Sequence, residues 1–390
     1  MKRLGILGST GSIGRSCLSV VGENRDRFQV VSMTAGENAE LMARQVQEVE
    51  PAFVSMATEQ AANDLRSRLR QAGAKSTPEI SFGQAGIKQA ATLPEVDLVV
   101  SSTVGVAGLP ATYEALLAGK QIALANKEVL VAAGELVTAA ARAKSIELLP
   151  VDSEHNAVHQ CLRGGRKEEA SILVLTASGG PFLHTPAAEI ESATVEQALN
   201  HPTWKMGSRI TIDSATMMNK GFEVIEACWL FGFSPKQVRV KVHPQSTVHS
   251  LVEFVDGSIL AQISITDMRL PILYALTYPE RMPYKNHRFD WSSLTTLEFL
   301  EPDMEQFPCL GLAYRAMECG GSYPCALNAA DEIAVAAFLD RKIPFGAIAR
   351  VIREVLESVP GRKFKTIDDV LDHDRFCRAR ASEIAARHSN

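Results

Sequence analysis

The chain has 390 residues, which at about 150 residues per domain is enough for two or three domains with cores of their own. A small scaffold held together by disulfides is therefore excluded. Apolar residues make up 46% and charged residues 22% of the chain, as in folded globular proteins. The formal net charge is −5 and neither sign forms a long block, so we expect no nucleic-acid-binding face.

Cysteine usage and hydrophobicity predict a location in the cell. The seven cysteines are scattered and contain no Cys-x-x-Cys pair, which is typical of a reducing compartment. The most apolar stretch, residues 122–141, is interrupted by residues 126–128 and by Glu135, so it is too polar to cross a membrane. A strand-and-glycine pattern already occupies residues 3–14, where a signal or transit peptide would lie. We expect a cytoplasmic protein with no membrane segment.

Residues 1–150 alternate short apolar runs with helical stretches, the pattern of a parallel sheet with crossover helices. A helix over 109–119, which ends at a glycine, separates the last two predicted strands. The predicted strands are 4–7, 28–33, 52–55, 97–101 and 121–124. This alternation predicts an α/β domain of the doubly wound, Rossmann type.

Residues 151–285 change character and predict an α+β domain. We predict strands at 172–176 and 210–212 and a helix over 217–231. Two further apolar runs, 251–255 and 259–265, are joined by Asp-Gly, which is a strong hairpin-turn signal.

The rest of the chain predicts a linker and then helices. Residues 279–308 contain four prolines and little periodicity, and we interpret 286–308 as a linker. From Ile348 to Leu356 apolar residues recur on one face of a helix, and Thr366 with Asp369 forms a capping-box pattern. We therefore expect a carboxyl-terminal helical bundle over 309–390.

A glycine-rich loop at residues 8–14, GSTGSIG, joins the first strand to a helix-like stretch. Glycines in this position let the backbone approach a pyrophosphate, and the amides at the helix start attract its charge. The spacing Gly-x-x-Gly-x-x-Gly differs from the usual Gly-x-Gly-x-x-Gly, and a tight turn without a ligand is the alternative. Glu37 follows the next strand, where an acidic residue holds the ribose of NAD, so taken alone it favours NAD over NADP; an exposed loop glutamate is the alternative.

Carboxylates recur in two segments. Asp152 and Glu154 follow an apolar lead, and in an extended segment residues two apart share one face. In the helix predicted over 217–231, a polar side opposes an apolar side. Glu223 on this helix adds a third carboxylate to Asp152 and Glu154, and three carboxylates without a Cys or His cluster suit Mg²⁺ or Mn²⁺. An ordinary amphipathic helix is the alternative. The polar side carries Asn219, Lys220, Glu223 and Glu226, and Ser214 just before it adds a phosphate-binding donor.

Three further segments have the composition of sites. The hydroxyl and amides of 178–180, Ser-Gly-Gly, can bind an anion. The polar loop 200–209 contains Trp204, which we expect to be exposed on a mobile flap; a loop anchored by a packed tryptophan is the alternative. Residues 123–128 end a strand at the carboxyl edge of the sheet, where α/β proteins bind ligands.

Seven ordered motifs resemble the 1-deoxy-D-xylulose 5-phosphate reductoisomerase family of the non-mevalonate isoprenoid pathway, from about Lys2 through the carboxyl-terminal helices. They are GSTGSIG, ALANKE, VDSEHNA, TASGGPF, NHPTWKMG, DSATMMNKGFEVIEA and VHPQSTVHSLVEF. The resemblance implies a homodimer whose chains have an NADPH domain (1–150), a catalytic domain (151–285) and a helical domain (309–390). It implies a phosphorylated sugar substrate, NADPH and one divalent cation, Mg²⁺ or Mn²⁺.

The resemblance also implies roles for single residues. Metal ligands would be Asp152, Glu154 and Glu223, and these with Lys127 would be the catalytic residues. Cofactor contacts would be Thr10, Gly11, Ser12, Ile13, Gly36, Asn38, Asn126, Glu128 and Gly207, beside Glu37 at the ribose position. Substrate contacts would be Lys127, Ser153, Glu154, Ser178, His201, Trp204, Ser214, Asn219, Lys220 and Glu223.

In the implied reaction, a carbon–carbon bond of the sugar breaks and re-forms, and NADPH then reduces the branched aldehyde. Lys127 would stabilise oxyanion charge or supply a proton. Glu37 departs from this pattern, because it places a like charge where the NADPH 2′-phosphate would bind and where some members have lysine; Arg44 is a nearby cation. Three other functions remain open: a metal-dependent phosphosugar isomerase or aldolase without a redox step, a dinucleotide-sensing regulator, and a metal-free dehydrogenase.

Overall fold

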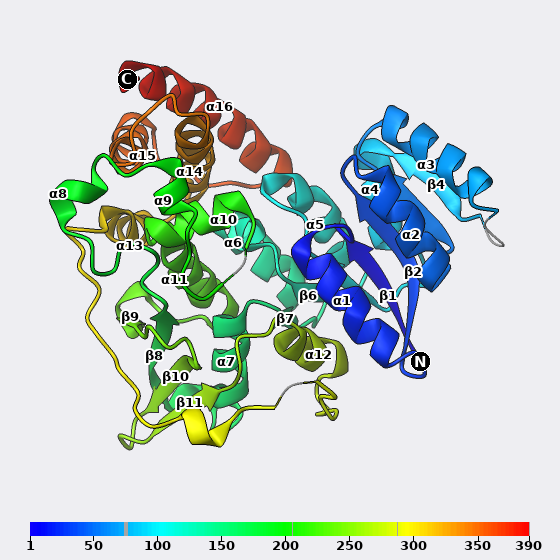
Figure 1. The fold of residues 1–390 in the computed structure, drawn as a ribbon, viewed down its shortest axis with the longest axis horizontal. Helices are drawn as coiled ribbons and strands as arrows, with labels where there is room; N and C mark the ends of the chain where they lie inside the picture. Colours follow the sequence, from blue (N-terminus) through cyan, green and yellow to red (C-terminus); the bar gives the residue numbers. More distant parts are fainter. Residues whose placement is uncertain (74–76, 205, 287, 390) are drawn as a thin grey trace. The chain divides into compact units, whose positions relative to one another are not determined.

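The computed structural model describes residues 1–73, 77–204, 206–286 and 288–389 (Figure 1). Lys205 of the predicted flap and residue 287 of the predicted linker lie outside the described residues. The chain forms two compact units, which we call unit 1 and unit 2. Unit 1 contains Met1–Val129, Val137–Asn156 and Asp267–Asn286, and unit 2 contains Leu130–Leu136, Ala157–Thr266 and His287–Asn390.

Unit 1 is built on a seven-stranded sheet in which all neighbouring strands are parallel (Figure 1). The strand order is β4-β3-β2-β1-β5-β6-β7, so successive strands are added on one side of β1 and then on the other. The strands are β1 (Lys2–Leu7), β2 (Phe28–Ala35), β3 (Phe53–Met56), β4 (Glu79–Phe82), β5 (Leu98–Ser101), β6 (Gln121–Leu124) and β7 (Leu148–Pro150). The prediction of a doubly wound sheet is confirmed, and its crevice lies at the carboxyl ends of β1 and β5.

Crossover helices connect these strands. They are α1 (Ser12–Glu23), α2 (Ala39–Val49), α3 (Glu59–Gln71), α4 (Gly83–Thr92), α5 (Leu109–Leu117) and α6 (Lys127–Ala143). The returning segment of unit 1 adds α12 (Arg269–Thr277), which packs against α1. Buried apolar residues of the strands, such as Leu4, pack with residues of α1, α2, α3 and α12, such as Met42, to form a core of this unit. The sequence did not predict the short edge strands β4 and β7.

Unit 2 contains a mixed four-stranded sheet in the order β11-β10-β8-β9. Its strands are β8 (Ala170–Ala177), β9 (Val238–Val242), β10 (Val248–Phe254) and β11 (Ile259–Ile263). The predicted Asp256-Gly257 hairpin joins β10 to β11, and Gly257 has a φ of +85°, which favours glycine. Smaller helices in this unit are α8 (Ala187–Ile190) and α9 (Val195–Ala198).

One predicted strand is wrong. Residues 210–212 lie inside helix α10 (Ser208–Ala215), not in a strand. The alternation of apolar and polar residues in Ile-Thr-Ile favoured a strand. In the structure this segment is one turn of a helix, and the side chain of Ile212 packs into the hydrophobic core of unit 2. Thr211 donates its hydroxyl hydrogen bond to the Gly207 carbonyl four residues earlier, which satisfies that group within the helix.

The helical prediction for the end of the chain is confirmed by four helices: α13 (Pro308–Cys319), α14 (Tyr323–Leu339), α15 (Ala347–Ser358) and α16 (Ile367–Arg387). The apolar face of α15 is fully buried, as its spacing predicts. Thr366 accepts a hydrogen bond from the Asp369 amide at 3.1 Å, and Asp369 accepts one from the Thr366 amide at 3.0 Å, so the capping box is present.

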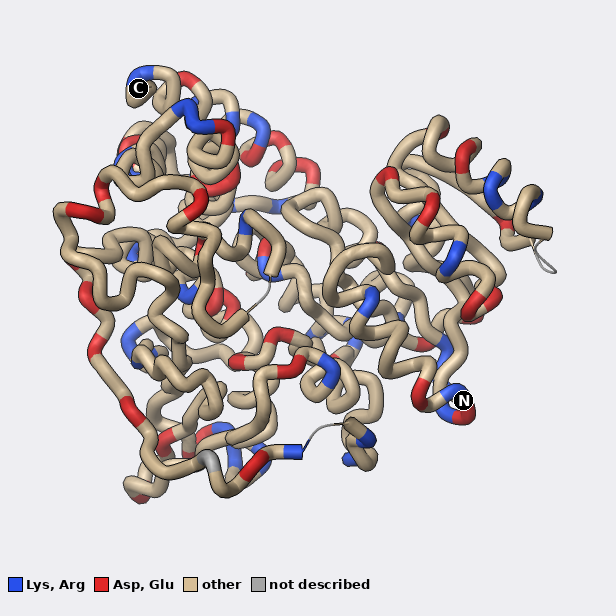
Figure 2. The backbone as a smooth tube through the Cα atoms, in the orientation of Figure 1, with Lys and Arg blue, Asp and Glu red and all other residues tan. Residues whose placement is uncertain are grey.

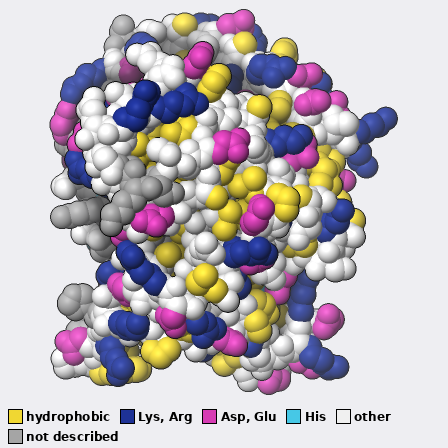
Figure 3. All heavy atoms as spheres, turned by 90° about the vertical axis from the view of Figure 1, so that its right-hand side faces the viewer, with side chains coloured by type: hydrophobic (Ala, Val, Ile, Leu, Met, Phe, Trp, Pro, Cys, Tyr) yellow, Lys and Arg dark blue, Asp and Glu magenta, His cyan; other side chains and the backbone are white. Residues whose placement is uncertain are grey.

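Charge is distributed evenly along the chain. Figure 2 shows basic and acidic residues interspersed in both units, and on the face drawn in Figure 3 side chains of both signs lie among apolar ones. In the described part of the chain, no helix combines the length and apolarity needed to cross a bilayer.

Candidate cofactor, metal and phosphate sites

The glycine loop joins the end of β1 to the start of α1 and is packed too tightly for side chains. Gly8 has a φ of +88°, and a Cβ atom there would lie 2.7 Å from the Ser102 carbonyl oxygen. A Cβ atom on Gly14 would lie 2.6 Å from the Ser9 carbonyl carbon. The first amides of α1 have no acceptor within the helix, so the loop presents donors at the sheet crevice. This geometry fits a pyrophosphate.

Unit 1 brings the other predicted cofactor residues, except Gly207, to the same edge of the sheet. The loop 36–38 follows β2, and residues 126–128 follow β6, while β1 and β5 lie between these two strands. Gly207 precedes α10 in unit 2. Glu37 is exposed, and Arg44 forms an ion pair with Glu40 on the surface of α2.

Two predicted cofactor residues also cap helices. The Asn38 side chain accepts a hydrogen bond from the Leu41 amide at 3.0 Å, at the start of α2. The Asn126 side chain accepts one from the Val129 amide at 3.3 Å, at the start of α6, and donates to the Gly105 carbonyl at 3.0 Å. Both asparagines therefore stabilise the starts of helices at the crevice, in addition to the cofactor contacts predicted for them.

The Asp152–Glu154 segment does not have the predicted backbone conformation. It is not extended, because helix α7 (Ser153–Leu162) begins between the two carboxylates. Asp152 accepts a hydrogen bond from the Glu154 amide at 3.3 Å, as acidic residues do at helix starts, and this favours helix over strand. Lys127 forms an ion pair with Asp152. Sequence reasoning missed His155, which is buried with its Nδ1 3.6 Å from an Asp152 oxygen, a pairing that the i, i+3 spacing in a helix would have indicated.

Helix α11 (Met218–Phe231) carries its charged side chains into the protein interior. Lys220 and Glu223 are 4% and 1% exposed and form an ion pair. The Asn219 amide donates a hydrogen bond to the other Glu223 oxygen at 2.7 Å. Glu226 is buried like the apolar Ile225, so the side of the helix that was predicted to be polar does not face solvent. An ordinary solvated helix face is therefore excluded here.

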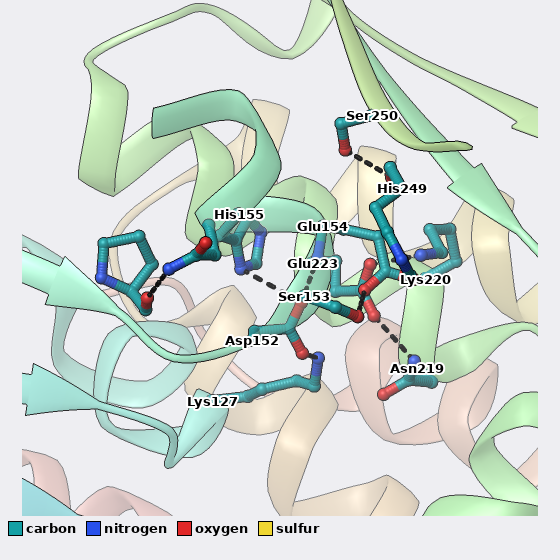
Figure 4. A network of polar contacts seen from close by, with 12 residues as sticks. Lys127, Asp152, Ser153, Glu154, His155, Asn219, Lys220, Glu223, His249 and Ser250 are labelled. Carbon is teal, nitrogen blue, oxygen red and sulfur yellow. Dashed lines mark hydrogen bonds and ion pairs between the residues drawn. The ribbon is translucent and has the colours of Figure 1, made fainter. Parts of the chain in front are cut away.

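Three carboxylates lie close together. One oxygen from each of Asp152, Glu154 and Glu223 lies within 4.8 Å of the other two (Figure 4). Like charges at this separation repel one another unless a cation or proton compensates. An oxygen-only donor set suits a hard divalent cation such as Mg²⁺ or Mn²⁺ better than zinc. The residues present therefore fit the predicted metal.

The predicted phosphate-binding residues of unit 2 come from neighbouring backbone segments. Ser178 and Gly180 follow β8, and a Cβ atom on Gly180 would lie 2.8 Å from the Ser214 carbonyl oxygen, so this loop packs directly on α10. Gly180 also has a φ of +67°. Close approach and backbone conformation both require glycine at this position.

His201 fixes the orientation of the Ser178 hydroxyl. The Nδ1 atom of His201 accepts hydrogen bonds from the Thr203 and Trp204 amides at 3.2 and 2.9 Å, so the proton of the neutral ring is on Nε2. Nε2 is 3.0 Å from Ser178 Oγ and donates to it. Burial lowers the pKa of His201, which favours this neutral form. Ser178 Oγ also accepts from the Gly180 amide at 3.2 Å, so its own proton is available to an anion.

Trp204 is half-buried, so the prediction that it is exposed is wrong. Its backbone is held by the hydrogen bond to His201, which folds residues 201–204 into a compact turn. Among the described residues of the loop 200–209, those that are exposed are Asn200, Pro202, Thr203, Gly207 and Ser208.

The fold and these sites define a class of protein: an α/β oxidoreductase with a dinucleotide crevice and an acidic metal-binding cluster. A family model described as 1-deoxy-D-xylulose 5-phosphate reductoisomerase matches residues 4–134, and two models of its C-terminal domains match 148–231 and 263–380. The reductoisomerase of Solibacter usitatus is 54% identical over 387 residues, covering 99% of this chain and 98% of the relative. The chain belongs to the 1-deoxy-D-xylulose 5-phosphate reductoisomerase family.

Other relatives and solved structures agree with this membership. The reductoisomerase of Geotalea uraniireducens is 49% identical over 384 residues, 98% of each chain. The structure of the Zymomonas mobilis reductoisomerase with NADPH has a TM-score of 0.92 and 41% identity, and it covers 98% of this chain and 99% of that one. A reductoisomerase complex with NADPH, fosmidomycin and magnesium has a TM-score of 0.92 and 39% identity, covering 99% and 98%.

The tight packing of the glycine loop gives a testable prediction. Gly14→Ala should weaken NADPH binding at least about 10-fold and lower the free energy of unfolding by about 1–3 kcal/mol, because the new methyl group overlaps the loop backbone. Gly22→Ala, on the same helix, is the control, since its Cβ atom would meet nothing closer than 3.9 Å. Fluorescence titration with NADPH and urea unfolding measure both effects. Unchanged NADPH affinity in Gly14→Ala would show that the loop does not bind the dinucleotide.

Proposed function

We propose that the protein converts 1-deoxy-D-xylulose 5-phosphate to 2-C-methyl-D-erythritol 4-phosphate, using NADPH and a divalent cation, in isoprenoid precursor biosynthesis. The observation that carries this proposal is the meeting of three carboxylates in a chain whose parallel sheet also carries a glycine loop at its crevice. The first feature suits a metal-assisted rearrangement and the second a reduction by a dinucleotide. Relatives named 1-deoxy-D-xylulose 5-phosphate reductoisomerase match the chain over nearly its full length.

The dinucleotide would lie along the carboxyl edge of the sheet in unit 1. In this proposal the glycine loop holds the pyrophosphate, and the loop 36–38 holds the ribose. The proposed contacts are Thr10, Gly11, Ser12, Ile13, Gly36, Glu37, Asn38, Asn126, Glu128 and Gly207. Arg44, the nearby cation, pairs with Glu40 on the surface of α2.

The metal ligands we propose are Asp152, Glu154 and Glu223. A divalent cation bound there supplies Lewis-acid polarisation of the substrate's carbonyl and hydroxyl oxygens. Lys127, paired with Asp152, holds a positive charge and a transferable proton beside this cluster, and we assign it to oxyanion stabilisation or proton supply. The positive charges of the cation and of Lys127 would stabilise the negative charge that develops on the substrate's oxygens while its carbon–carbon bond breaks and re-forms, before hydride transfer.

The substrate phosphate supplies binding energy that orients the reacting carbons. We assign it to the hydroxyl of Ser178, whose proton His201 leaves available, and to Ser214, Asn219 and Lys220. Ser153 and His201 would contact the substrate's hydroxyl groups, and Trp204 would cover the substrate and exclude water.

Three features of the molecule's organisation stay proposals. We propose three functional domains, residues 1–150, 151–285 and 309–390 with a linker at 286–308, which limited proteolysis within the linker would test. We also propose a cytoplasmic location, which cell fractionation would test. Finally, we propose a homodimer.

The edge strand β11 supports the homodimer. Among the described strands, β10 is its one neighbour in the sheet, and its apolar residues Ile259 and Ile263 are 58% and 36% exposed. An apolar edge strand is a ready surface for pairing with a second copy of the chain.

A coupled assay tests the proposed reaction. With 1-deoxy-D-xylulose 5-phosphate, NADPH and Mg²⁺ or Mn²⁺ together, absorbance at 340 nm should fall, and omission of any one component should abolish the fall. Substrate consumption without NADPH oxidation would instead indicate an isomerase or aldolase. Full activity after chelation of divalent ions would indicate a metal-free dehydrogenase, and dinucleotide binding without any turnover would indicate a regulator.

Glu223→Gln tests the metal assignment. We expect kcat to fall at least about 100-fold, because the glutamine amide has no negative charge to compensate the charge of the cation and binds it more weakly. The concentration of Mn²⁺ at half-maximal activity should rise, whereas NADPH affinity should stay within twofold. Glu318→Gln, on an exposed position of α13, is the matched control. Near-normal turnover with an unchanged Mn²⁺ requirement would refute the role of Glu223.

Analytical ultracentrifugation tests the proposed homodimer. The wild-type protein should sediment as two 42.3 kDa chains, and Ile259→Lys with Ile263→Lys should shift it to one, because edge-strand lysines prevent strand pairing. Val255→Lys is a control at an exposed position of the preceding turn. A monomeric wild-type protein would overturn the proposal, and a double variant that remains dimeric would remove β11 from the interface.

A further inference from the structure

A buried glutamine on α2, which lies outside the glycine motif itself, holds the glycine loop by hydrogen bonds. Gln45 is 4% exposed, and Ser9, the second residue of the loop, is fully buried. The Ser9 hydroxyl donates to Gln45 Oε1 at 2.8 Å, and Gln45 Nε2 donates to the Ser9 carbonyl at 2.9 Å. The two residues thus form a reciprocal pair of hydrogen bonds across 36 positions of sequence.

This pair completes the fixation of Ser9. The Ser9 amide donates to the Thr34 carbonyl at 2.8 Å, and the preceding Gly8 amide donates to the same oxygen at 3.1 Å. The end of β2 therefore holds the amide of Ser9, while Gln45 holds its hydroxyl and its carbonyl. Every polar group of Ser9 has a protein partner, so Ser9 anchors the loop and does not offer a donor to a ligand.

The same helix also carries the loop proposed to bind the ribose. Residues 36–38 lead directly into α2, and the Asn38 side chain caps its first turn. Gln45 lies seven residues further on, about 10 Å along the helix axis. Because a helix of this length is rigid, α2 acts as a spacer between the 36–38 loop at one end and the glycine loop held by Gln45.

The burial of a primary amide needs a reason beyond filling space. An amide buried without hydrogen bonds is costly, and an apolar side chain would fill this position more cheaply. A fully hydrogen-bonded polar pair, in contrast, specifies one relative position of the two segments that it joins. The hydrogen bonds of Gln45 join a loop to a helix, and these carry the two proposed halves of the dinucleotide site.

We propose that Gln45 is a positioning residue that sets the spacing between the glycine loop and the 36–38 loop, and thereby the affinity for the dinucleotide. The inference rests on the proposed binding of NADPH along this edge of the sheet. Gln45 acts through Ser9 and α2 and does not itself touch the cofactor.

Gln45→Met tests this spacing role, because methionine preserves the side-chain length and removes both hydrogen bonds. The Kd for NADPH should rise about 10-fold, whereas the KM for the sugar phosphate and kcat at saturating NADPH should stay within about threefold. Gln47→Met is the matched control, since Gln47 is an exposed glutamine on the same helix. A lower melting temperature with unchanged NADPH affinity would overturn the proposal and leave Gln45 a purely structural residue.

A cofactor fragment separates spacing from a general distortion of the site. Adenosine 2′-monophosphate carries the phosphorylated ribose but no pyrophosphate, so it spans only one of the two loops. Its affinity, measured by competition with NADPH, should change less than twofold in Gln45→Met. Equal weakening of the fragment and of NADPH would contradict a spacing role.

Ser9→Ala is a second, milder variant, and it tests the positioning role of Gln45 even if Gln45→Met does not fold. It removes the hydroxyl donor, so NADPH affinity should fall, and the double variant should be no weaker than Gln45→Met because both act through one pair. Additive losses, or no loss in Ser9→Ala, would overturn the proposal. The wild-type titration is made first: absence of NADPH binding there would refute the proposed function, whereas wild-type binding with unaffected variants would refute only the role of Gln45.

Discussion

Burial of charge on α11 is the constraint on which the catalytic half of the structure depends. Glu223 is 1% exposed, and an ionised carboxylate in such a place is stable only when other groups compensate its charge and its lost hydration. Lys220 and Asn219 from the preceding turn provide two partners. The carboxyl-terminal helices provide the burial itself: α13 packs so closely on α11 that a Cβ atom on Gly221 would lie 2.6 Å from Ala313 Cβ. The helical end of the chain therefore helps to bury Glu223, one of the proposed ligands of the cation.

The parts of the fold that the sequence predicted well are those determined by local chemistry. The glycine loop follows from steric exclusion of side chains at Gly8 and Gly14, and the capping box at Thr366 from hydrogen bonds three residues apart. The prediction for 210–212 failed because alternation of apolar residues is also compatible with one helical turn, and packing of Ile212 decided the outcome. The two carboxylates of 152–154 converge although their backbone is not extended, since Asp152 precedes the helix and Glu154 occupies its first turn.

Residues of the candidate site differ in how visible their roles are in the sequence. Asn38 and Asn126 belong to motifs associated with cofactor binding, but in the folded protein their side chains also cap α2 and α6. Gln45 is the opposite case. In the sequence, its spacing from Met42 and Val49 places it on the apolar face of the helix, unlike the exposed Gln47, but this spacing does not identify its partner. Its partner Ser9 is brought to it by the parallel pairing of β1 with β2, a tertiary contact that residue spacing does not encode.

The turn 201–204 links the protonation state of His201 to the phosphate binding proposed at Ser178. In neutral His201, Nδ1 accepts two amide hydrogen bonds and Nε2 donates to Ser178, which leaves the serine proton for an anion. A protonated ring would carry a hydrogen on Nδ1 that faces both amides, so protonation and the folded turn oppose each other. Burial and these two bonds therefore favour the same neutral state, and the lowered pKa of His201 extends that state to a lower pH than in an ordinary histidine. His201 thus orients the Ser178 hydroxyl as a donor only while its ring is uncharged. Among the residues proposed to bind the phosphate, Lys220 on α11 provides the positive charge.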